Sequence, residues 1–196
     1  NAEIKLSCSP KLANCENCLE HDLIFPLKKF SKNTSGLDVE ADESQIIDGN
    51  YMLSGNVAVA SEKLFLSGDS VEVSTVDDTL VASGQVKYQD DSYLISGDSL
   101  SVVQKNDEIT ASATNAYYQD YSIGHGGANG YTELIKKTPS KILLSNSTFS
   151  LCPINENNWL IEASQINLDT ESNRGKANNA VLKFYGVPIF YTPTYS

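Results

Sequence analysis

Four cysteines are the residues of this chain with the most distinctive chemistry. Cys8, Cys15 and Cys18 lie near its beginning, and Cys152 lies far downstream, directly before a proline. The Cys15-x-x-Cys18 spacing is compatible with a redox motif or with half of a zinc site, which would need about four ligands and therefore His21 as well. A thioredoxin-like motif needs a βαβ context that the sequence does not show. We therefore favour structural disulfides, formed in an oxidising compartment, and expect no metal.

Groups used by hydrolytic enzymes are present, but their arrangement does not indicate a catalytic site. Asp77-Asp78 and Asp90-Asp91 fall in predicted turns, where solvated aspartates are common. His21 and His125 are not accompanied by a Ser-His-acid order. The glycine-rich run over residues 124–130 matches a dinucleotide loop only loosely and lacks the parallel βαβ unit. The sequence predicts a protein that is not an enzyme and that binds no cofactor.

The composition is that of an acidic globular protein. The chain has 196 residues, of which 40% are hydrophobic and 20% are charged. Its 25 Asp and Glu against 14 Lys and Arg give a net charge of −11, which opposes binding to nucleic acid. No apolar run approaches the roughly 18 residues that a membrane-spanning helix needs.

A 29-residue repeat organises the middle of the chain. The segment Leu53–Val59 returns as Ala82–Tyr88, and Leu66–Val73 returns as Ile95–Val102. A unit of two short strands cannot bury its apolar face alone, so neighbouring units must stack to form a continuous core. The repeat predicts an elongated β structure, more typical of a conduit or a scaffold than of a compact enzyme.

The alternation of side chains predicts that the strands are bent. Apolar residues change parity across Gly68-Asp69 and again across Gly97-Asp98. Such a slip moves side chains to the other face unless a bulge or bend absorbs it, and glycine favours the bend. We therefore expect kinked antiparallel strands that pass from one wall of a two-walled roll into the other.

The walls are predicted to enclose an apolar interior. This interior is either a dry, closed core, which is the usual meaning of apolar alternation, or a slot for acyl chains. The residues expected to line it are Leu53, Val57, Val59, Leu66, Val71, Val73, Val86, Tyr88, Ile95, Leu100, Val102, Ile109, Tyr117, Phe149, Ile161, Ile166 and Leu168.

Four segments resemble a known family. The opening stretch Leu37–Asp42, the Cys-Pro stretch Phe149–Pro153 with the following Trp159–Ser164, and the late segment Val187–Pro193 are similar to the periplasmic N-terminal (OstA-like) domain of the LptD family. The resemblance covers residues 37–196. It implies an all-β, OstA-like β-jellyroll over residues 37–185, preceded by an irregular cysteine-containing arm and linker over residues 1–36. Residues 186–196 would lead into a C-terminal transmembrane β-barrel.

The resemblance also implies a function and partners. Lipopolysaccharide would be transported to the outer membrane, with the domain on the periplasmic side and the acyl chains of lipid A in the groove. A periplasmic OstA-like bridge protein would deliver them by strand addition at a docking edge formed by Leu37, Val39 and Ala41. The barrel would be plugged by an outer-membrane lipoprotein.

The family resemblance implies disulfide partners for the cysteines. Rival interpretations of the function stay open. Cys152 and one of Cys8, Cys15 and Cys18 would pair with barrel cysteines, leaving two of the three for a local disulfide. The first rival is a structural β-repeat or adhesin module with a filled core. The others are a free-standing periplasmic lipopolysaccharide carrier and a remote glycan-active enzyme.

Overall fold

The computed structural model describes residues 22–32, 36–105, 108–122, 127–154, 158–172 and 174–196, and its strands form one antiparallel sheet. The strands are β1 (Asp38–Glu40), β2 (Glu43–Ile47), β3 (Asn50–Ala60), β4 (Phe65–Ser74), β5 (Thr79–Gln89), β6 (Tyr93–Lys105), β7 (Glu108–Asp120), β8 (Ala128–Lys137), β9 (Lys141–Phe149), β10 (Trp159–Asp169), β11 (Arg174–Phe184) and β12 (Val187–Tyr195). From β3 onward, each strand pairs with the next in the chain, while β1 and β2 both pair with β3. Over these residues, no helix has the length and apolar character needed to cross a membrane.

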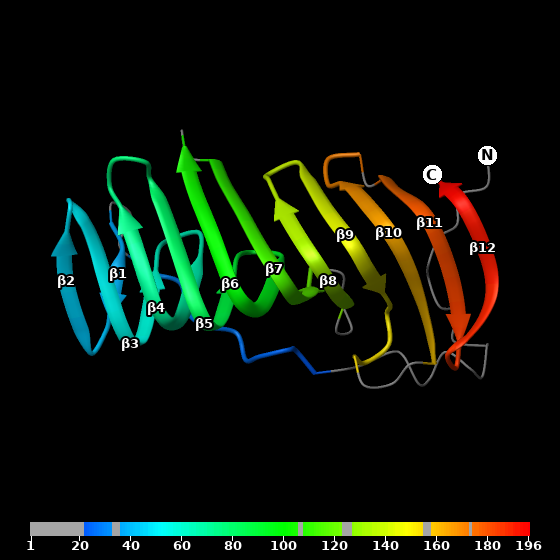
Figure 1. Cartoon of the computed structure of the whole chain (residues 1–196), viewed down its shortest axis with the longest axis horizontal. Helices are drawn as coiled ribbons and strands as arrows, with labels where there is room; N and C mark the ends of the chain where they lie inside the picture. Colours follow the sequence, from blue (N-terminus) through cyan, green and yellow to red (C-terminus); the bar gives the residue numbers. More distant parts are fainter. Residues whose placement is uncertain (1–21, 33–35, 106–107, 123–126, 155–157, 173) are drawn as a thin grey trace.

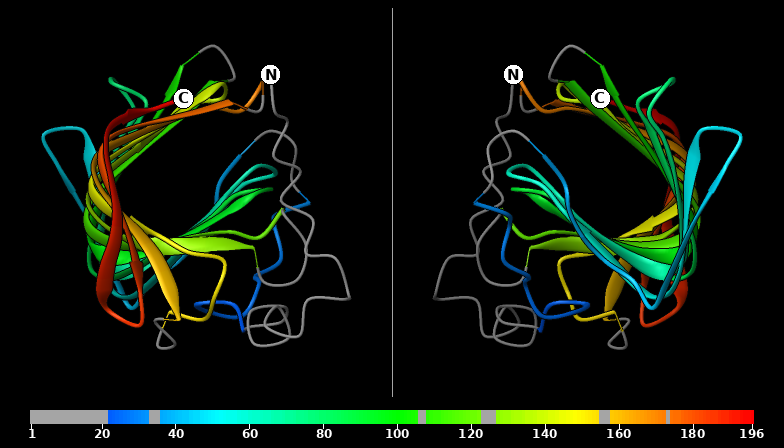
Figure 2. Two further views of the ribbon diagram at one scale, coloured as in Figure 1. Left: turned by 90° about the vertical axis from the view of Figure 1, so that its right-hand side faces the viewer. Right: turned by 90° about the vertical axis from the view of Figure 1, so that its left-hand side faces the viewer.

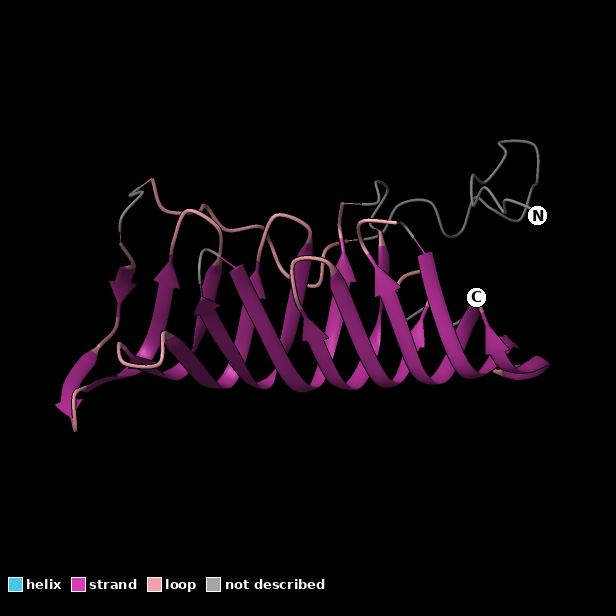
Figure 3. Ribbon diagram, turned by 90° about the horizontal axis from the view of Figure 1, so that it is seen from above, coloured by secondary structure: helices cyan, strands magenta, loops and turns pink. Residues whose placement is uncertain are grey.

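The sheet is folded along its length into a trough. Figure 1 shows the strands side by side along the long axis, and the end-on views of Figure 2 show the bent strands forming two walls with an opening on one side. Seen from above, the successive strands cross the molecule as a regular series (Figure 3). We call the edge with the β4–β5 and β8–β9 turns the upper rim and the edge with the β3–β4 and β5–β6 turns the lower rim. The predicted two-walled architecture of kinked strands is confirmed.

The bend coincides with positive-φ residues in alternate strands. Positive φ angles occur near the middle of β3, β5, β7, β9 and β11, at Asn56, Gln85, Asn115, Asn146 and Asn179. Asparagine tolerates this left-handed conformation better than most residues do. In β3 and β5, register shifts at the same places show one extra residue in the bulged strand. Because a bulge bends and twists its strand, the bulges of β3 and β5 fold this part of the sheet, and the register of β7 continues past Asn115 without a shift.

Two glycines allow the bulges of β3 and β5 to pack. Gly55 and Gly84 have positive φ, and a Cβ added at either would overlap a nearby aspartate, Asp42 between β1 and β2 or Asp69 on β4. The sequence predicted glycine-supplied bends at Gly68 and Gly97, but the positive φ angles lie on the facing strands. The predicted position of the bend is therefore right, and the strand that carries the strained backbone is different.

The described part of the arm runs along the lower rim. Residues 22–32 form no strand and lie beneath the ends of the strands (Figure 1), and the N–H of Ser31 donates to the carbonyl of Ser61 in the β3–β4 turn. The side-chain amide of Gln89 accepts from the backbone N–H of Lys28 at 2.6 Å and donates to the carbonyl of the same residue at 3.0 Å. Gln119 accepts from Ile24 N–H at 2.8 Å. Two buried glutamines thus fix the arm in the way that a neighbouring strand would.

Candidate functional site

The inner face of the trough is apolar along most of its length. All of the residues predicted to line it, except Tyr117, belong to one hydrophobic cluster or pack against that cluster. Those that pack against it and are only partly buried are Val73, Ile109, Phe149, Ile161 and Leu168. The sequence therefore identified inward residues on β3 to β7, β9 and β10.

The prediction for Tyr117 is wrong. Its side chain is 46% exposed and makes an edge contact with Tyr131 on the outer face, with ring centroids 5.4 Å apart. The inward residues of this strand are Ala116 and Tyr118, because the positive-φ residue Asn115 changes the parity. In the pairing through Ile95, the counterpart of Tyr88 is Tyr118 instead of Tyr117, because β7 lacks the extra residue of the β5 bulge.

Several inward residues were missed by the sequence analysis. The cluster also includes Leu64, Leu80, Tyr93, Ile135, Ile142 and Leu144. Simple alternation within one strand would have found Ile142 and Leu144, which share the face of Ile166 across the β9–β10 pairing. For Leu80, the signal is its parity with the buried Ala82.

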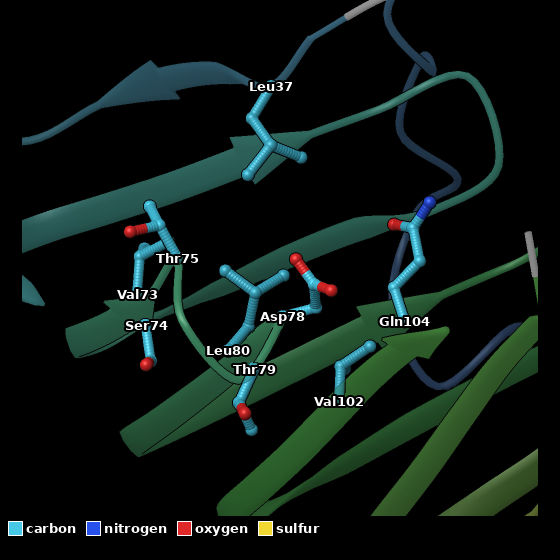
Figure 4. Close-up of a pocket in the computed structure, with 9 residues that line it drawn as sticks. All are labelled: Leu37, Val73, Ser74, Thr75, Asp78, Thr79, Leu80, Val102 and Gln104. Carbon is cyan, nitrogen blue, oxygen red and sulfur yellow. The ribbon is translucent and has the colours of Figure 1, made fainter. Parts of the chain in front are cut away.

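The interior is filled at the lower wall of the first strands, and a pocket lies at their upper rim. Val59, Leu66 and Ile95 are fully buried against their neighbours. A pocket of about 380 Å³ lies closer to the first strands, where Leu37 faces residues of the β4–β6 upper rim (Figure 4). Its apolar lining includes Val73, Leu80 and Val102, which all point to the inside of the trough. The pocket is therefore a preformed opening between the two walls.

A buried carboxylate lies at the lower rim, in the β5–β6 turn. Asp90 is only 5% exposed, and its Oδ1 accepts from the backbone N–H groups of Ser92 at 3.0 Å and Tyr93 at 2.8 Å. Its Oδ2 accepts from the Tyr88 hydroxyl at 3.0 Å. The prediction of a solvated turn residue is wrong for Asp90, although Asp77, Asp78 and Asp91 are exposed as predicted.

Lys137 supplies the countercharge of Asp90 from the other rim. Its Nζ lies 2.7 Å from Asp90 Oδ2 and 5.5 Å from the centre of the Tyr93 ring. The side chain of Lys137 is 16% exposed. Burial and the nearby Asp90 raise the pKa of the Tyr88 phenol, and burial and Asp120 do the same for the pKa of Tyr93. Both phenols therefore stay neutral donors at neutral pH.

The two ends of the sheet present open edges. Within the described residues, no strand pairs with the outer edge of β1, β2 or β12. In the predicted docking edge, Leu37 and Val39 are 39% and 44% exposed, and Ala41 is exposed as well. Residues 37–44 form two short strands instead of one, because the chain turns at Asp42, beside the bulge of β3. At the other end, β12 extends the same sheet past the predicted boundary at residue 185.

The remaining reactive residues do not form a site among the described residues. Cys152 is fully buried, whereas Cys8, Cys15, Cys18, His21 and His125 lie outside the residues that the structure describes. Over the described ranges, no group of three or more His, Cys, Asp and Glu is placed to hold a metal ion. The pairing of the cysteines stays a prediction.

Comparison with known proteins identifies the family. The family described as "LptA/(LptD N-terminal domain) LPS transport protein" matches residues 38–174, which is more than two thirds of this chain. The chain belongs to this family. The match confirms the predicted OstA-like domain and its general role in lipopolysaccharide transport. The family is one of transport proteins, in agreement with the prediction that the chain is not an enzyme.

Individual relatives of this LptD N-terminal domain match over shorter stretches. The chain is 43% identical over 47 residues to the LPS-assembly protein LptD of Methylococcus capsulatus, covering 24% of this chain and 5% of that protein. The LptD proteins of Idiomarina loihiensis and Pseudoalteromonas atlantica are 30% and 36% identical over 77 residues, covering 39% of this chain and 10% of each relative. The matched stretches thus span a tenth or less of these relatives.

A solved structure gives a more distant similarity. The LptA-homologous periplasmic component LptH of Pseudomonas aeruginosa is 14% identical, with 73% of this chain and 82% of that chain covered and a TM-score of 0.30. This score is too low to support an inference about the path of the backbone.

Proposed function

We propose that this chain is the domain of a lipopolysaccharide-assembly protein that takes the acyl chains of lipid A into its trough. The observation that carries the proposal is the shape of the sheet. One continuous sheet folds so that its apolar face is turned inward from β3 to β11 (Figure 2), and among the described residues no strand pairing joins the two rims. A slot of this form accepts chains along its axis and leaves a polar head group in water.

The energetics favour cargo held by its tails. Each methylene group transferred from water into an apolar interior contributes about 0.8 kcal/mol. The head group of the lipid carries phosphate, and a protein of net charge −11 does not attract it strongly. Affinity that depends on the chains alone suits a carrier that must release its cargo.

The filled lower wall of the trough sets a condition on this transport. Side chains such as Leu66 and Ile95 leave no exposed surface there, so lipid can pass only when the walls separate. The same observation favours the rival function, a structural module with a closed core. The pocket between Leu37 and Val102 favours transport, because a cavity between the walls is the place where a chain would enter first.

The open edges supply the connections that such a carrier needs. A periplasmic bridge protein of the same family would add a strand at the edge of Leu37, Val39 and Ala41, using the free backbone groups of β1 and β2. The β12 end would lead to the translocon barrel and its plug lipoprotein. We accordingly place the domain on the periplasmic side of the outer membrane.

A photo-crosslinking pair tests the proposal. A photoreactive amino acid at Val73, which lines the pocket, is expected to capture lipopolysaccharide. The matched control is Val81, which lies one strand away on the outer face and is 43% exposed. Capture at Val73 but not at Val81 supports a lipid-carrying trough, and equal or absent capture at both positions contradicts it.

A further inference from the structure

An ion pair crosses the mouth of the trough. Lys137 ends β8 at the upper rim, and its side chain lies on the inward face that it shares with Ile135. Asp90 lies in the β5–β6 turn at the lower rim. The 2.7 Å contact between Lys137 Nζ and Asp90 Oδ2 therefore joins the two walls instead of two neighbouring strands.

The contact is built so that one side can leave. Asp90 is held by donors of its own rim, namely the Tyr88 hydroxyl and the N–H groups of Ser92 and Tyr93. The Tyr121 hydroxyl donates to the Asp90 carbonyl and fixes the same turn. When the ammonium group departs, the carboxylate keeps these donors, so it is not left as a buried charge without partners.

Lys137 reaches the lower rim as a single flexible side chain. Its ammonium group touches Asp90 and lies over the Tyr93 ring, and both partners belong to the opposite wall. The lower rim is braced by the arm through Gln89 and Gln119, whereas Lys137 is partly exposed at the mouth. Separation therefore amounts to a swing of the lysine into water, or to a movement of the upper rim, and the turn of Asp90 stays in place.

The position of this pair matters for a lipid that moves along the trough. If acyl chains lie inside and the head group stays outside, the linkage between them must pass through the mouth. The contact between Asp90 of the β5–β6 turn and Lys137 of β8 joins the two rims and blocks the passage of that linkage. The pocket at Leu37 and Val73 lies on the side of this contact nearer to the first strands. We propose that the Asp90–Lys137 pair is a gate on the lipid path, closed in this structure, which must separate before lipid reaches β9 to β12. This inference rests on the proposed function.

The experiment uses the full-length protein that contains this chain, with purified lipopolysaccharide as the probe. A photoreactive amino acid is placed either at Val73, before the gate, or at Ile161 on β10, beyond it. The rate of capture at Ile161 is measured relative to that at Val73. In Lys137→Met, we expect the rate at Ile161 to rise roughly threefold to tenfold and the rate at Val73 to stay unchanged.

Two further variants and a matched control accompany this change. Lys137→Arg preserves the charge across the mouth and is expected to keep the original rate, whereas the shorter, neutral Lys137→Gln should accelerate capture as Lys137→Met does. Lys183→Met removes a comparable ion pair, in which Nζ of Lys183 lies 2.5 Å from Glu162 Oε1 between neighbouring strands β10 and β11. That control should leave capture at Ile161 unchanged.

The outcomes separate the gate from the proposed function. An unchanged rate at Ile161 in both neutral variants, with melting temperatures near that of the original protein, overturns the gate. Acceleration in Lys183→Met as well overturns it too, since the effect would then belong to any lost ion pair. Absence of capture at both positions in the original protein contradicts the proposed lipid carriage instead.

Discussion

At the scale of single residues, Asp90 shows how an interior position changes the role of a common turn residue. Its neighbour Asp91 is exposed, but Asp90 carries its charge inside the trough and is balanced by Lys137. Burying a carboxylate is unfavourable unless donors and a countercharge accompany it, and both are present here. The sequence shows two adjacent aspartates and gives no sign that they differ.

Asp90→Asn tests this difference through stability. The change leaves Lys137 without its countercharge. It also replaces one of the two carboxylate oxygens, which accept from two N–H groups and a hydroxyl, with an NH₂ group that cannot accept. We expect the free energy of unfolding to fall by about 2 kcal/mol, below the usual cost of breaking a fully buried pair because Lys137 is partly exposed. Urea denaturation of Asp91→Asn provides the control, with an expected change within about 0.5 kcal/mol. Equal losses in the two variants would show that Asp90 has no special role.

The buried tyrosines predict a loss of stability at alkaline pH. The pKa values of Tyr88, Tyr93 and Tyr118 are all raised above the ordinary 10.0, with burial as the leading cause. Their stabilising contribution is complete below pH 10 and decreases as pH rises, because the unfolded chain releases these protons first. Above pH 10, the free energy of unfolding is expected to fall by about 1.4 kcal/mol per pH unit for each of these tyrosines. Denaturation series from pH 9 to 11.5 measure it, and Tyr88→Phe should reduce the slope; an unchanged slope would contradict the assignment.

At the scale of the strand, the bend of the first strands depends on the bulges of β3 and β5. Gly84 combines a positive φ with a place where the side chain of Asp69 already occupies the space of a Cβ. The sequence predicted the position of the bend, since the change of parity at Gly68 and Gly97 is visible in the pattern. It did not predict the strand that bears the bulge, because facing strands both carry glycine there.

A pair of glycine substitutions separates the cost of the positive φ from the cost of close packing at the bulge. Gly84→Ala meets both the positive φ and the overlap with Asp69, and should lower the free energy of unfolding by about 3 kcal/mol. Gly49→Ala has the positive φ but no atom within 4 Å, so only about 1 kcal/mol is expected. Thermal or urea unfolding measures both. Similar losses would mean that the close packing of the bulges contributes nothing.

At the scale of the whole molecule, repetition made much of the fold predictable. Val57, Val86 and Ile95 face inward as the repeat required, whereas Tyr117 does not, because β7 lacks the extra residue of the β3 and β5 bulges at Asn115. The arm contacts of Gln119 and the pairing of Asp90 with Lys137 depend on which rims meet in space. Such contacts follow from the folding of the trough and leave no local pattern in the chain.

The open first edge gives a prediction about assembly. A lysine at Val39 would place a charge on β1, and charged residues on an edge strand oppose the addition of another strand. Val39→Lys is expected to weaken binding of an LptA-type partner by roughly tenfold or more, as measured by fluorescence titration. Val76→Lys, in the exposed β4–β5 turn, should leave the affinity unchanged. If both variants bind like the original protein, the docking edge lies elsewhere.

The most direct test of the trough as a lipid carrier places the probe on the lipid. Lipopolysaccharide with a photoreactive group at the end of one acyl chain is incubated with the full-length protein, and the labelled residues are found by mass spectrometry. The account predicts labels on inward residues around the pocket, such as Leu80 and Val102. Labels confined to outer-face residues such as Val81 and Tyr117, or none on this domain, would contradict it.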